Sequence, residues 1–124
     1  MSQILAIAAG GSLGAVMRYL MSTGVYSWLG RGFPYGTLTV NVLGSLAMGL
    51  LYELFLQRLS ISPEVRALLL VGFLGAFTTF SAFSIETVHL IEQGDLLKAV
   101  GNILASVILC VLATWCGLLI ARQL

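Results

Sequence analysis

Long apolar runs alternate with short polar connections along the whole chain. Four runs of about 20 residues are almost free of charged side chains, and about 20 such residues in a helix cross a bilayer. We expect four helices, at about 3–20, 36–56, 67–91 and 98–120. The pattern therefore predicts an all-α integral membrane protein with a single four-helix transmembrane domain, residues 1–124.

Polar side chains recur every four residues in two of these helices, which places each set on one helix face. The stripe of the second helix consists of Thr37, Asn41 and Ser45. The stripe of the fourth helix consists of Asn102, Ser106, Cys110 and Thr114. Polar groups in hydrocarbon need partners. Two interpretations stay open: the stripes tie helices together, or they form rows of neutral donors that suit a small, hard anion.

The third apolar run contains a segment, GFLGAFTTFSAFS at 72–84, whose composition weakens a helix. Gly72 and Gly75 lower helix propensity, and the hydroxyls of Thr78 and Thr79 compete for backbone carbonyls. We therefore expect the third helix to be broken near its middle, between Gly75 and Thr79. An unwound turn at membrane depth must be buried in protein or line a cavity, and its freed carbonyls bind cations.

Two phenylalanines follow the expected break. Phe80 and Phe83 are three residues apart and share a helix face. Aromatic rings have electropositive edges, so phenylalanines turned edge-on contact an anion while they resist water. Packing against other helices or lipid is the alternative, and the residues by themselves leave that choice open.

Composition supports membrane insertion and argues against other classes of protein. Hydrophobic residues make up 59% of the chain, charged residues 9%, and the mean hydropathy is +1.03. A net charge of +1 without a basic run gives no support to nucleic-acid binding. Cys110 and Cys116 lie six apart in one helix, which predicts neither a disulfide nor a zinc site. The start, MSQIL, lacks Lys and Arg, so we expect a retained helix and not a cleaved signal.

Basic residues are divided evenly between the two predicted sides of the membrane. The side that holds the N-terminus, the second loop and the C-terminus carries Arg58, Arg66 and Arg122. The opposite side carries Arg18, Arg31 and Lys98. Orientation normally follows an excess of Lys and Arg in the cytoplasmic loops. The tie is either chance in a small protein or the mark of a dual-topology protein that assembles as an antiparallel homodimer. Four short helices enclose little room, which favours a functional unit of at least two chains.

Three blocks, GGSLGAVMRY, GTLTVNVLGSLAMG and GFLGAFTTFSAFSIE, resemble the Fluc (CrcB) family of bacterial fluoride channels. The combined match is specific and covers most of the chain. It implies an antiparallel homodimer in a prokaryotic plasma membrane, with two fluoride pathways along the dimer interface and a structural sodium ion at its centre. The implied function is passive export of cytoplasmic fluoride, without catalysis.

The resemblance also implies roles for single residues. The fluoride pore would be lined by Phe80, Phe83, Asn41, Ser106 and Thr79. Gly75 and Thr78 match positions whose backbone carbonyls bind sodium in the broken third helix. Arg18 matches an arginine that raises the anion concentration at a vestibule, and snorkelling to the interface is an equally good account. Glu86 lies in the same block and has a vestibular or structural role.

Two departures from the family pattern and two rival functions accompany this hypothesis. Ala82 stands where a threonine is expected, and Cys110 stands where a second serine is usual, although a thiol is a weak donor.

A small proton-coupled multidrug exporter has a similar size but needs a carboxylate in its first helix, which this chain lacks. A non-conducting accessory subunit would use the stripes only to dock a larger membrane protein.

Overall fold

The computed structural model describes residues 1–58 and 60–124, and the regular secondary structure of this part of the chain is all helical. Four of its helical spans are long and apolar enough to cross a membrane, as the sequence predicted. The side chain of Arg58, one of the basic residues counted above, lies outside the described residues. The elements are α1 Ser2–Leu29, α2 Tyr35–Glu53, η1 Leu54–Arg58, α3 Pro63–Arg66, η2 Ala67–Phe73, α4 Leu74–Phe77, α5 Phe80–Glu92 and α6 Leu96–Gln123.

The first helix is longer than the sequence pattern indicates. α1 continues past the predicted end at Leu20 and stops at Leu29, where Gly30 takes a positive φ of 85°. Polar residues beyond Leu20 do not end the helix, and the Ser22 hydroxyl bonds back to the Tyr19 carbonyl at 3.4 Å. Arg18 therefore lies inside a span, which corrects its place in the loop charge count.

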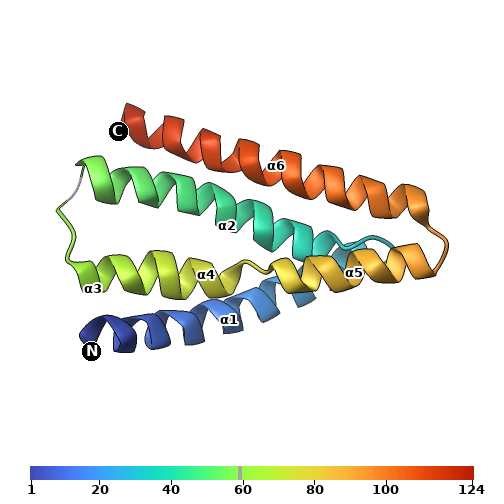
Figure 1. Cartoon of the computed structure of the whole chain (residues 1–124), viewed down its shortest axis with the longest axis horizontal. Coiled ribbons are helices and arrows are strands. Elements are labelled where there is room, and N and C mark those ends of the chain that lie inside the picture. The colour runs from blue at the N-terminus through green and yellow to red at the C-terminus, as the bar shows by residue number, and fades with distance from the viewer. Residues whose placement is uncertain (59) are drawn as a thin grey trace.

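The four spans form two parallel pairs, visible in Figure 1. α2 runs beside α6, and α1 runs beside α3, η2 and α4, the part of the third span that precedes α5. Small residues permit close approach: a Cβ on Gly49 of α2 would collide with the Thr114 carbonyl of α6, and a Cβ on Gly14 of α1 with the Phe73 carbonyl. Thr114 Oγ1 also donates to the Ser45 carbonyl at 3.0 Å, so this member of the α6 stripe ties two helices together.

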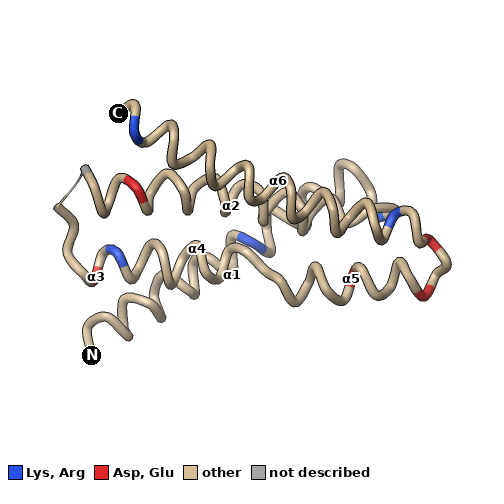
Figure 2. Tube along the Cα trace, turned by 45° about the horizontal axis from the view of Figure 1, so that its top comes forward, with Lys and Arg blue, Asp and Glu red and all other residues tan. Residues whose placement is uncertain are grey.

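Charged residues gather mainly toward the two ends of the bundle, as Figure 2 shows. At one end Arg122 of α6 contacts Glu53 of α2 at 3.2 Å.

Two segments, η1 and η2, are π-helical, which nothing in the sequence pattern signalled. Phe55, Leu70 and Leu74 form a buried cluster between α2 and the third span. The middle of the bundle is thus apolar except for the site described below.

Gly49→Ala should weaken the pairing of α2 and α6, because the added methyl group would meet the Thr114 backbone. We expect a loss of about 1–3 kcal/mol in the free energy of unfolding, the usual cost of overpacking. Thermal denaturation in detergent micelles measures the change. Gly24→Ala is the matched control, since nothing lies within 4 Å of a Cβ at that position. Equal melting of the two variants would contradict the proposed contact.

Candidate functional site

The third span is interrupted for two residues. α4 ends at Phe77 and α5 begins at Phe80, while Thr78 (φ −89°, ψ 158°) and Thr79 (φ −151°, ψ 118°) are extended. Figure 1 shows the interruption as an uncoiled stretch between α4 and α5. It lies at the C-terminal end of the stretch in which the sequence predicted a break.

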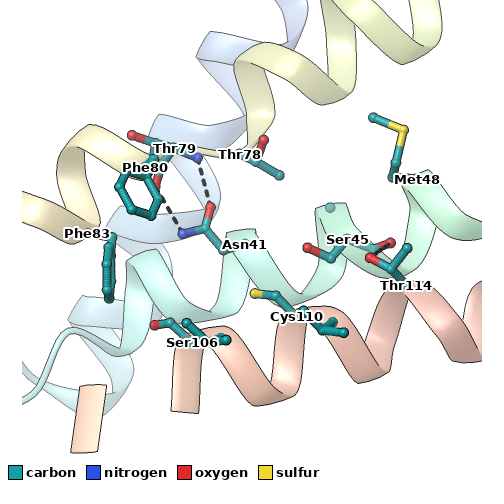
Figure 3. Close-up of a pocket in the computed structure, with 13 residues that line it drawn as sticks. Asn41, Ser45, Met48, Thr78, Thr79, Phe80, Phe83, Ser106, Cys110 and Thr114 are labelled. Atoms are coloured by element: carbon teal, nitrogen blue, oxygen red, sulfur yellow. Dashed lines mark hydrogen bonds between the residues drawn. The ribbon is translucent and has the colours of Figure 1, made fainter. Parts of the chain in front are cut away.

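Asn41 of α2 holds the extended backbone at the interruption. Its side-chain amide makes two hydrogen bonds to one residue: the Thr79 amide donates to Oδ1 at 2.7 Å, and Nδ2 donates to the Thr79 carbonyl at 3.0 Å. Figure 3 shows both bonds. An asparagine side chain thus replaces the helical partners that Thr79 lacks, which satisfies two backbone groups at membrane depth.

The Thr79 side chain completes the break by capping α5. Its Oγ1 accepts a hydrogen bond from the Ala82 amide at 3.1 Å. In an unbroken helix the Ala82 amide would donate to the Thr78 carbonyl, and the Thr79 amide to the Gly75 carbonyl. Within the described residues neither carbonyl oxygen accepts a hydrogen bond. The interruption therefore leaves the carbonyls of Gly75 and Thr78 open to another ligand.

A cavity of about 380 Å³ lies beside the interruption, between α2, α6 and the third span (Figure 3). Phe80 and Phe83 border it with ring centroids 5.2 Å apart and an interplanar angle of 46°. The Phe80 side chain is 76% exposed, whereas Phe83 is buried. No charged residue of the described chain lines this cavity. Its polar lining consists of Asn41, Ser45, Thr78, Thr79, Ser106, Cys110 and Thr114.

A line of hydrogen bonds leads away from the cavity between α5 and α6. Ser106 Oγ donates to Asn102 Oδ1 at 3.4 Å, and Asn102 Nδ2 donates to Thr87 Oγ1 at 2.9 Å. Thr87 Oγ1 in turn donates to the Phe83 carbonyl at 2.7 Å. Asn102 is 2% exposed, so it serves as a tie between two helices.

A second cavity, of about 400 Å³, lies where α1, α5 and the start of α6 meet, and its lining is rich in charge. Glu86 lies here and not in the first cavity. Its Oε2 accepts a 2.6 Å hydrogen bond from the Tyr26 hydroxyl, which also pairs with Thr37 Oγ1 at 3.2 Å. The Arg31 guanidinium stands 4.5 Å from the centroid of the Tyr26 ring. Sequence reasoning missed Tyr26, because it lies beyond the predicted end of the first helix.

Arg18 reaches the interruption from α1. Its Nε donates to the Ala76 carbonyl at 3.0 Å, and Ala76 belongs to the last turn before the break. A cation at the C-terminal end of a helix interacts favourably with the helix dipole. The guanidinium is therefore in contact with the broken helix, outside the residues that line the first cavity.

Comparison with known proteins assigns the chain to a family. A family model described as CrcB-like protein, Camphor Resistance (CrcB), matches residues 5–118. The chain belongs to the CrcB family. The fluoride-specific ion channel FluC of Magnetococcus marinus is 56% identical over 120 residues, which cover 97% of this chain and 98% of that protein. FluC of Geobacter sulfurreducens is 52% identical over 124 residues, the whole of both chains.

A third CrcB-family relative is longer. FluC of Methylococcus capsulatus is 54% identical over 121 residues, which is 98% of this chain. The chain spans only 53%, about half, of that protein's length. The match to the family nonetheless extends over all four spans, because the other two relatives are covered almost completely.

The structure brings together most of the residues that the resemblance to the CrcB family selected. The first cavity gathers Asn41, Thr78, Thr79, Phe80, Phe83 and Ser106. Gly75, Arg18 and Glu86 lie outside its lining, although Gly75 lies in the last turn before the interruption and Arg18 bonds to that turn. Of the two departures from the family pattern, Cys110 lines the cavity, and Ala82 contributes its backbone amide to the Thr79 cap.

Asn41→Ala should destabilise the fold, because it leaves the amide and the carbonyl of Thr79 without their partners. An unsatisfied buried polar group costs about 1–3 kcal/mol, and we expect a loss within that range. Denaturant titration of the protein in micelles measures it. Ser45→Ala, one turn along the same face, removes a hydroxyl from the cavity lining and should change stability by less than about 0.5 kcal/mol. A similar loss in both variants would show that Asn41 does not hold the break.

Proposed function

We propose that this chain is a passive, fluoride-selective channel that exports cytoplasmic fluoride across a prokaryotic plasma membrane. The observation that carries this proposal is a cavity at membrane depth lined by neutral hydrogen-bond donors and two phenylalanine rings. The full-length relatives named as fluoride-specific channels support the choice of ion. A thermodynamically passive pathway needs no catalytic group.

Selectivity for fluoride over chloride follows from the hydrogen-bond donors that the cavity lining offers to a dehydrated ion. Nδ2 of Asn41 carries two N–H groups, of which one is bonded to the Thr79 carbonyl, so the other is available to an anion. The Ser106 hydroxyl adds a further donor when it turns from its long 3.4 Å bond with Asn102 Oδ1 toward the ion. The ring edges of Phe80 and Phe83 supply weak positive charge. Fluoride is small and accepts strong hydrogen bonds. Chloride is larger and gains less from the same donors, so dehydration excludes it.

The conducting unit is an antiparallel homodimer with two pathways along its interface. Phe80 is largely exposed in one chain, so a pathway that includes its ring needs a further wall. With Arg18 taken out of the count, three basic residues remain on one side and two, Arg31 and Lys98, on the other, and this small difference supports insertion in both orientations. The partner chain supplies the missing wall of each pathway.

A structural sodium ion occupies the centre of this dimer. The donor set fits such an ion, since the carbonyls of Gly75 and Thr78 are freed by the bonds that Asn41 and Thr79 make. Two chains that meet at the break contribute four carbonyl oxygens, which suits a bare monovalent cation. The ion supplies a fixed positive charge that holds the two broken helices together.

The rival functions find less support. A proton-coupled exporter needs a carboxylate within the first helix, and α1 carries neither Asp nor Glu. An accessory subunit has no need for a cavity that collects donors and aromatic rings at a helix break. It also predicts that the purified protein conducts no ion.

Phe80→Ile should lower fluoride flux because it removes the ring that borders the cavity while it keeps an apolar side chain. We expect a fall of about ten-fold or more, equivalent to roughly 1.4 kcal/mol in the barrier. Efflux from liposomes, followed with a fluoride electrode, measures the rate. Phe73→Ile is the matched control, since Phe73 stacks on Phe77 at 6.0 Å and does not line the cavity. Undiminished efflux through an intact Phe80→Ile dimer would refute the proposed pathway.

A further inference from the structure

Arg18 is a partly buried cation in a membrane span, and its position at the break is unusual for a charge. Its Nε bonds to the neutral Ala76 carbonyl, and no carboxylate of the described chain forms a salt bridge with it. Charged groups at this depth are costly and tend to have a function. Capping the C-terminal end of the helix that stops at Phe77 accounts for the hydrogen bond but does not require a full charge.

The Arg18 contact divides the carbonyls at the end of α4 into two groups. The Ala76 carbonyl is bonded to the guanidinium, while the carbonyl oxygens of Gly75 and Thr78 accept no hydrogen bond in the described chain. The guanidinium is thus bonded to the helical turn before the break, next in sequence to the open Gly75 carbonyl. Its positive charge opposes any cation that binds there, and the repulsion grows in proportion to the charge of that cation.

We propose that Arg18 is a specificity-determining residue that makes the carbonyl site at the break accept monovalent cations and reject divalent ones. The inference rests on the sodium site of the proposed function. Size cannot make this distinction, because Ca²⁺ and Na⁺ are similar in radius and Ca²⁺ also binds carbonyl oxygens. For two unit charges about 7 Å apart under an effective dielectric constant of about 20, the repulsion lowers affinity roughly fifty-fold, so the second charge of Ca²⁺ costs it that factor relative to Na⁺.

Arg18→Gln removes the charge but keeps an N–H donor, and Arg18→Lys keeps the charge on a different donor. Thermal melting of each purified dimer, titrated with Na⁺ or Ca²⁺ against a large organic cation, reports binding without any measurement of transport. We expect Na⁺ and not Ca²⁺ to stabilise the wild type and Arg18→Lys. Arg18→Gln should lower the preference for Na⁺ over Ca²⁺ about fifty-fold, because the repulsion that it removes is twice as large for Ca²⁺ as for Na⁺. Arg18→Met, also neutral and of similar length, replaces Arg18→Gln if that variant does not fold.

The outcomes separate the inference from the function on which it rests. If Na⁺ stabilises the wild type but the neutral variants still reject Ca²⁺, Arg18 does not set the valence and only this inference fails. The same conclusion follows if Arg18→Lys gains Ca²⁺ binding as the neutral variants do. If Na⁺ has no effect on the melting of the wild type, the sodium site is absent and both proposals are overturned.

Discussion

Backbone amides and carbonyls at membrane depth must be bonded within the protein, and this requirement governs the third span. A break in a helix frees such groups, and Asn41 compensates for it with two hydrogen bonds to Thr79. The arrangement depends on α2 lying beside the break, which in turn depends on the close pairing of α2 with α6. One amide side chain therefore links the packing of the bundle to the geometry of the site.

The same bonds determine what remains available for ligands. Asn41 and Thr79 take two amides away from their helical acceptors, so the carbonyls of Gly75 and Thr78 stay open. The side chains of Asn41 and Phe80 border the cavity beside the same break. A single interruption thus offers oxygens to a cation and donors to an anion, within a few residues of each other. Neutral donors and carbonyls achieve this without a buried carboxylate.

The sequence was sufficient for the four spans, for the position of the break and for most residues of the cavity. Runs of apolar residues, four-residue spacing and the Gly and Thr content of the third run carry that information locally. The partners of Asn41 and Arg18 were not predictable in this way, because the contacts join positions 38 and 58 residues apart. Tyr26 was missed because the polar residues after Leu20 resemble a loop, although α1 continues through them to Leu29.

The central claim is that donors and aromatic rings at a broken helix select fluoride. The most direct test compares the efflux of fluoride and of chloride from sodium-loaded liposomes that contain the purified wild-type protein. The account predicts rapid loss of fluoride while chloride is retained. Equal efflux of both ions, or no efflux from a well-folded dimer, would contradict the account. The two polar stripes would then serve only to pack helices together.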